Sequence, residues 1–129
     1  GLSKGEALHT STFLGHPVGC AAGLAMITLF ENGLLERGNE LGAHMGTTLE
    51  VLVQKHPQHF KGVRGRGCMR ALELTGGVVV ALRLMRGMLE KGYIIFPCGQ
   101  NADAMSFTPP LTMTAHQWDA ALDALQTLL

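Results

Sequence analysis

The chain has 129 residues, 47% hydrophobic and 16% charged, values typical of one globular domain with an apolar core. Ten Lys and Arg balance ten Asp and Glu, and aromatic residues make up only 5%, so neither charge nor base stacking favours nucleic acid or an anionic membrane as a partner. The three cysteines include no CxxC pair, which indicates reduced thiols in the cytoplasm. No apolar stretch of about 18 residues is free of breaks, so we expect no membrane span and no signal peptide.

The sequence of the N-terminal half predicts an irregular segment followed by two helices. Residues 1–15 are rich in Gly, Ser and Thr and are expected to be irregular. A helix over 17–30 has proline in its first turn and is apolar on nearly every side, so we expect protein to cover it all round. Asn32-Gly33 ends this helix. A second, amphipathic helix over 34–55 is ended by His56-Pro57.

The sequence of the C-terminal half predicts short strands and two further helices. One helix covers 78–91, and the last begins at Thr114, where Gln117 completes a capping-box pattern. The strands are expected at residues 68–74, 93–96 and 105–108. Three short strands with four helices predict an α+β domain of two layers, in which helices cover one face of a small sheet.

One polar segment is a candidate anion site. Residues 9–17 place hydroxyl groups, a glycine and two histidines directly before a helix N-terminus. Hydroxyl and backbone N–H donors at such a position suit a phosphate. A polar loop with local Ser and Thr capping bonds explains the same residues, and on chemistry alone it is the favoured interpretation.

Two other patterns favour structural roles. His9, His16 and Cys20 have a spacing suggestive of a metal site, but no fourth ligand is near in sequence and packed side chains explain them better. Gly62–Gly67 has the composition of a phosphate loop. It follows a helix and precedes a strand, the reverse of a dinucleotide fingerprint, so its glycines indicate tight backbone geometry.

Several motifs together resemble one family. His9-Thr-Ser-Thr-Phe-Leu-Gly-His-Pro17, followed by Gly19-Cys-Ala-Ala-Gly-Leu-Ala25, resembles the HxSTxxGNP-x-x-x-AAxLA segment of class III aminotransferases. These are fold-type I enzymes that depend on pyridoxal phosphate. Val63–Leu74 resembles their VRGxGLMxxxEL strand, and Lys91–Pro97 and Phe107–Thr112 resemble their RGxxxxP and PPLxI elements. The resemblance covers nearly the whole chain in the family's order.

The resemblance implies a fold, a cofactor and partners. Residues 1–129 would form the C-terminal small domain, with 1–16 as an inter-domain, active-site loop and 17–129 as helices and a small, mostly antiparallel sheet. Thr12 would bind the phosphate of pyridoxal 5'-phosphate in the neighbouring subunit, with Ser11 as the second candidate. The implied partners are an N-terminal large cofactor-binding domain, a second copy in a homodimer, and small amines and oxo acids as substrates.

The chain departs from the family pattern at several positions. The family's Schiff-base lysine lies upstream of this segment, and Lys4 lacks its setting, so no catalytic residue is assigned and the chain alone is expected to be inactive. Ser106 stands where many members have an arginine that holds a substrate carboxylate, and His16 stands where they have asparagine. The turn between Leu74 and Val78 is short for the family.

The sequence therefore predicts part of an enzyme that transfers an amino group between an amino compound and an oxo acid or aldehyde. One alternative is an aminomutase or decarboxylase of the same fold. The other is a non-catalytic, stand-alone α+β module for binding or oligomerisation.

Overall fold

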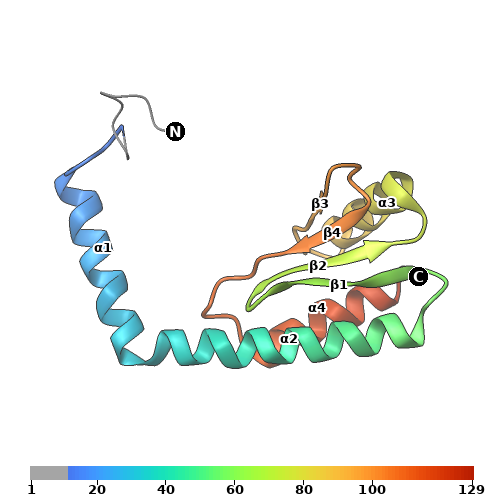
Figure 1. The fold of residues 1–129 in the computed structure, drawn as a ribbon, viewed down its shortest axis with the longest axis horizontal. Coiled ribbons are helices and arrows are strands. Elements are labelled where there is room, and N and C mark those ends of the chain that lie inside the picture. The colour runs from blue at the N-terminus through green and yellow to red at the C-terminus, as the bar shows by residue number, and fades with distance from the viewer. Residues whose placement is uncertain (1–11) are drawn as a thin grey trace, which may run out of the picture. The chain divides into compact units, whose positions relative to one another are not determined.

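A computed structural model of the chain describes residues 12–129 (Figure 1). The chain divides into two compact units, the first reaching to Gly33 and the second running from Leu34 to Leu129.

The first unit contains one helix, α1 (Pro17–Leu29), within its described part. Proline occupies its first turn, as expected. The helix continues into a short π-helical turn, η1 (Phe30–Leu34), where Asn32 and Gly33 leave helical geometry and Gly33 has a φ of 95°. A glycine suits this break because positive φ costs it little. The predicted break at Asn32-Gly33 is therefore present.

The helical run Pro17–Lys55 is long and apolar enough to cross a membrane by length and composition alone, since an 18-residue window within it has a mean hydropathy of 1.5. The break at Asn32-Gly33 divides this run, and α1 itself has 13 residues. At about 1.5 Å per residue, such a helix is about 20 Å long, which is short of a hydrocarbon core of about 30 Å. Length and composition alone do not distinguish a membrane-spanning helix from a helix that is covered by other parts of a protein. This run is therefore no evidence for a membrane span.

The second unit is built on an antiparallel sheet of four strands in the order β1-β2-β4-β3. The strands are β1 (Phe60–Arg66), β2 (Met69–Leu74), β3 (Phe96–Cys98) and β4 (Ala104–Phe107). The expectation of three strands was wrong, because the glycine-rich segment before residue 68 is itself a strand that pairs with β2 as a hairpin. The expected strand at 93–96 was also placed too early. Pro97 lies inside β3, which is possible because β3 is an edge strand.

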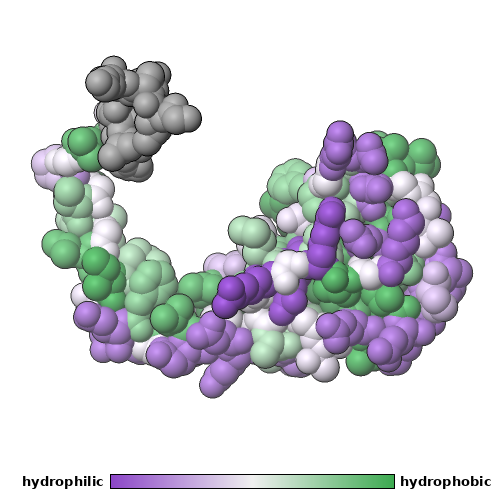
Figure 2. Space-filling model, viewed as in Figure 1, coloured by the Kyte–Doolittle hydropathy of each residue, from purple (hydrophilic) through white to green (hydrophobic). Residues whose placement is uncertain are grey.

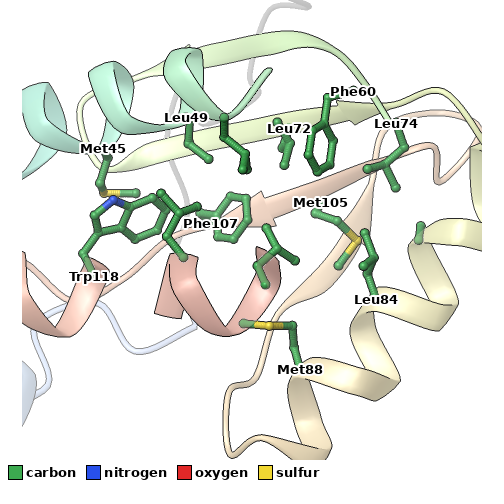
Figure 3. Close-up of a cluster of buried hydrophobic side chains, with 14 of the residues drawn as sticks. Met45, Leu49, Phe60, Leu72, Leu74, Leu84, Met88, Met105, Phe107 and Trp118 are labelled. Atoms are coloured by element: carbon green, nitrogen blue, oxygen red, sulfur yellow. The ribbon is translucent and has the colours of Figure 1, made fainter. Parts of the chain in front are cut away.

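Three helices cover one face of this sheet: α2 (Leu35–Lys55), α3 (Gly77–Glu90) and α4 (Ala115–Gln126). Figure 3 shows side chains from these helices meeting Leu72, Leu74, Met105 and Phe107 of the two central strands. These four residues point to the same face because side chains alternate along a strand, and all four are buried. The predicted α+β fold with an antiparallel sheet covered by helices is confirmed.

Glycines on α2 hold the β1–β2 hairpin close to the helix. Gly42 is so near the hairpin that an added Cβ would lie 2.6 Å from the backbone carbon of Gly67. The guanidinium of Arg70 donates hydrogen bonds to the carbonyl oxygens of Gly42, Gly65 and Gly67, at 3.1, 3.2 and 3.0 Å. The hairpin is therefore fixed to α2 by backbone contact and by one arginine.

The last helix is fixed at its start and along its length. Thr114 and Gln117 form the predicted capping box, with each side chain accepting a backbone N–H of the other. The indole N–H of Trp118 donates to Thr48 Oγ1 at 2.8 Å, and His44 Nε2 lies 2.6 Å from Asp119 Oδ1. Both contacts join α4 to α2.

Candidate cofactor-phosphate site

Thr12 opens a turn that leads directly into α1. The turn covers residues 12–15, Gly15 has a φ of 72°, and the His16 N–H donates to the Phe13 carbonyl at 3.1 Å. Thr12 is exposed, so its hydroxyl is free to meet a ligand from outside this unit. Ser11, the second predicted residue, lies outside the described residues.

The start of α1 has the electrostatic character of an anion site. His16 is its N-cap residue but makes no side-chain capping bond, and the first turn contains no acidic residue. The N–H groups of a first turn have no partner within the helix, and the helix dipole favours negative charge there. The threonine hydroxyl and these uncapped N–H groups are donors of the kind that a phosphate accepts, so this set of residues fits the phosphate of pyridoxal phosphate.

The structure brings no metal site together among residues 12–129, where no three His, Cys, Asp or Glu side chains lie close enough to share an ion. Of the residues considered for a metal, His16 and Cys20 lie four residues apart at the start of α1, and His9 lies outside the described part. Cys20 is a free, exposed thiol.

The glycine-rich segment 62–67 has no arrangement that would hold a phosphate. Most of it belongs to β1, and Arg64 Nη1 lies 3.5 Å from Glu73 Oε1 on the neighbouring strand. The expectation that the glycines serve tight backbone geometry agrees with Gly65, whose added Cβ would lie 2.1 Å from the Met69 carbonyl oxygen.

Ser106 lies on β4 opposite Ala71 of β2 and Phe96 of β3. It therefore points away from the helices, to the face opposite Met105 and Phe107. On β2, β3 and β4, the only basic side chain is Arg70, which is engaged with backbone carbonyls near α2.

An apolar groove that was not predicted from the sequence lies between β4 and α4. The groove has a volume of about 460 Å³ and is walled by segments far apart in the chain, including Ile95, Phe107, Pro110 and Trp118. Tyr93 is the one titratable residue among those that line the groove, so we assign the groove no catalytic role. Periodicity within single segments gives no signal for a hollow that forms between them.

Comparison with known proteins gives the family. The profile of Aminotransferase class-III matches residues 2–129. The acetylornithine aminotransferase of Caldanaerobacter subterraneus subsp. tengcongensis is 35% identical over 94% of this chain and 30% of its own length. The ornithine aminotransferase of Brevibacillus brevis is 33% identical over 94% of this chain and 29% of its own length.

Solved structures give the same result. The lysine aminotransferase of M. tuberculosis superposes with a TM-score of 0.75 at 30% identity, over 81% of this chain and 23% of that protein. A phospholyase from Arthrobacter, in complex with phosphoethanolamine, superposes with a TM-score of 0.82 at 26% identity, over 95% of this chain and 31% of that protein.

A two-layer α+β fold is thus shared with enzymes of one class. The chain belongs to the class III aminotransferases, a family that depends on pyridoxal phosphate. It spans less than a third of the length of the curated relatives given above.

Proposed function

We propose that this chain is the C-terminal part of an enzyme that uses pyridoxal phosphate to transfer an amino group between a small amino compound and an oxo acid or aldehyde. The observation that carries the proposal is the family match over residues 2–129, with an antiparallel sheet and helix layer that superpose on an aminotransferase of known structure. When bound, the cofactor supplies a conjugated ring that accepts the electron pair released at the substrate carbon.

The proposed task of this chain at the active site is to hold the cofactor phosphate. Thr12 donates its hydroxyl, Ser11 is the second donor, and the first-turn N–H groups of α1 add a favourable field. A hydrogen bond to a charged group contributes about 1.5–3 kcal/mol, so losing it is expected to weaken cofactor binding roughly tenfold or more.

The test of this contact compares Thr12→Ala with Thr12→Ser in the complete chain. Pyridoxal phosphate retained after dialysis is measured by its absorbance, together with the melting temperature. We expect Thr12→Ala to lose cofactor and Thr12→Ser to keep most of it. Equal retention by the wild-type protein and by Thr12→Ala would remove Thr12 from the site.

The partners follow from the same proposal. A large N-terminal domain supplies the lysine and most of the cofactor site, and a second copy completes a homodimer. Together they cover α1, none of whose residues is buried in its own unit. We place the enzyme in the cytoplasm because Cys20, Cys68 and Cys98 are free thiols. Residues 1–129 alone are expected to have no activity, since no residue among them is assigned to the chemical step.

The second candidate function is a reaction other than amino transfer on the same fold, such as that of an aminomutase, a decarboxylase or another lyase. The similarity to the phospholyase from Arthrobacter favours keeping this candidate. Incubating the complete chain with an amino donor and an oxo acid separates the two. An amino acid with the carbon skeleton of the oxo acid, formed in step with loss of the donor, supports amino transfer. An isomer of the donor, or release of ammonia, carbon dioxide or phosphate, with the oxo acid left unconsumed, supports the second candidate.

A further inference from the structure

The break between α1 and α2 contains an asparagine that is followed by a glycine. Asn32 has φ and ψ of −93° and 24°, and Gly33 has a φ of 95°, so neither residue has helical geometry. Asn32 is exposed, and a Cβ added to Gly33 would meet no atom within 4 Å. The backbone nitrogen of Gly33 therefore has no side chain of its own beside it and open space where one would lie.

These two residues hold the atoms for a ring closure within the main chain. The Asn32 side chain ends in an amide, and its carbonyl carbon is within reach of the next backbone nitrogen once ψ rotates. Attack by the Gly33 nitrogen forms a C–N bond and closes a five-membered ring, while the side-chain NH2 leaves with the proton of that nitrogen as ammonia. Water then opens the ring at one of its two carbonyl carbons and gives aspartate or isoaspartate. Water is the only co-reactant.

The other two asparagines of the chain are also exposed, but the backbone nitrogen that follows each of them is held by a hydrogen bond. Asn39 lies inside α2, where the N–H of Glu40 belongs to the helical hydrogen-bond ladder. Asn101 is followed by Ala102, whose N–H donates to the Gly99 carbonyl at 3.2 Å and whose Cβ lies beside that nitrogen. The three asparagines thus differ in the residue that follows them and in the order of the local backbone.

We propose that Asn32 is a modification site, at which the complete protein loses ammonia through this ring and forms isoaspartate as it ages. Isoaspartate adds one carbon atom to the main chain between α1 and α2 and replaces a neutral amide with a carboxylate. Both changes fall on the link between the unit that contains Thr12 and the unit that contains the sheet. The inference concerns the backbone at Asn32 and holds whether or not the protein transfers amino groups.

The experiment incubates the complete folded protein near neutral pH and follows each asparagine by peptide mapping. Trypsin places the three asparagines in separate peptides, which cover residues 5–37, residues 38–55 and the segment that begins at 92. Conversion of an amide to a carboxylate raises the mass of its peptide by about 1 Da. An isoaspartyl-specific carboxyl methyltransferase with labelled S-adenosylmethionine then measures isoaspartate. Asn32→Gln, whose longer side chain would have to close a less favourable six-membered ring, is the test variant, and Asn39→Gln is its matched control.

We expect Asn32 to convert about tenfold faster than Asn39 or Asn101, because those two react only when their local structure opens. Asn32→Gln is expected to abolish most of the methyl incorporation, and Asn39→Gln to keep it. A rate at Asn32 within about twofold of the other two would overturn the proposal, as would conversion of Asn32 only after denaturation. Aspartate formed without isoaspartate would also overturn it, because direct hydrolysis of the side chain forms no ring. Cofactor retention is measured on fresh protein, so that a failure of the proposed function is recorded separately.

Discussion

At the scale of single residues, Gly42 shows how tertiary contact overrides helix propensity. Alanine in the middle of α2 would be favoured over glycine by about 1 kcal/mol on propensity alone. An alanine Cβ at this position would lie 2.6 and 2.7 Å from backbone atoms of Gly67, which have no rotamer to give way. We therefore expect Gly42→Ala to destabilise the fold by about 1–3 kcal/mol, the usual cost of overpacking.

Urea unfolding measures this difference, and Gly62→Ala is the matched control. An added Cβ at Gly62 meets only a Glu73 carboxylate oxygen, at 3.6 Å, an ordinary contact. The control is expected to stay near the wild-type midpoint. A Gly42→Ala protein as stable as wild type would mean that the hairpin does not pack against α2 as described.

Cys68, at the same hairpin, makes a pH-dependent contribution to the stability of the fold. Burial raises the pKa of the Cys68 thiol above its ordinary value of 9.0, and the nearby charge of Arg70 partly opposes the rise. Because the pKa is higher in the folded state than in the unfolded state, the thiol stabilises the fold below its ordinary pKa. That contribution is lost as the pH rises through the folded pKa.

The expected result is a steeper loss of stability above pH 9 for the wild type than for Cys68→Ser. Serine keeps a donor for the Gly38 carbonyl, which the thiol contacts at 3.2 Å, and does not ionise in this range. Melting temperatures from pH 7 to 10 provide the comparison. Parallel curves for the two proteins would show that the thiol is equally easy to ionise when folded and unfolded.

At the scale of elements, α4 depends on a cap that is visible in the sequence. The Thr114 hydroxyl accepts the Gln117 N–H at 3.2 Å, and the Gln117 side chain accepts the Thr114 N–H at 2.9 Å. Replacing such an N-cap with alanine costs about 1 kcal/mol. We expect this loss for Thr114→Ala in urea unfolding, and little loss for Thr114→Ser. A fully stable alanine variant would show that packing by Trp118 is enough to hold the helix start.

The helices were predictable from sequence to a greater extent than the strands. Apolar spacing marks α2 and α3, and the Thr114–Gln117 pattern marks the start of α4, because these signals are local. β1 was missed because its glycines resemble a loop, and only pairing with β2 makes it a strand. The strand before Pro97 was expected to end at this proline. Proline is tolerated inside an edge strand, but whether a strand lies at a sheet edge depends on partners distant in the chain. Of the proposed cofactor-phosphate site, the sequence provided the residue types, and the structure added the turn and the uncapped helix start.

At the scale of the whole molecule, the two units differ in how completely they bury their apolar residues. Residues 34–129 contain a closed core, and no buried side-chain N or O atom among the described residues lacks a hydrogen-bond partner. In α1, Val18, Leu24 and Ile27 are 71, 67 and 52% exposed, and Figure 2 shows its surface mainly in hydrophobic colours. An apolar surface of this kind usually meets another protein surface.

We therefore expect residues 34–129 to fold alone with a cooperative thermal transition. The full 129-residue chain is expected to bind a hydrophobic dye or to self-associate through α1. Circular dichroism and dye fluorescence, measured on both polypeptides, test this. Dye binding that is equally strong for residues 34–129 would place the exposed apolar surface in the second unit instead.

The central claim, that this chain is one part of an aminotransferase, is tested most directly by reading the coding sequence upstream of Gly1. We expect it to encode a large α/β domain with a glycine-flanked lysine a few tens of residues before Gly1. A start codon at or just before Gly1 would contradict the claim, because the protein could not then hold its cofactor through a lysine as the family does, and a non-catalytic α+β module would become the better account.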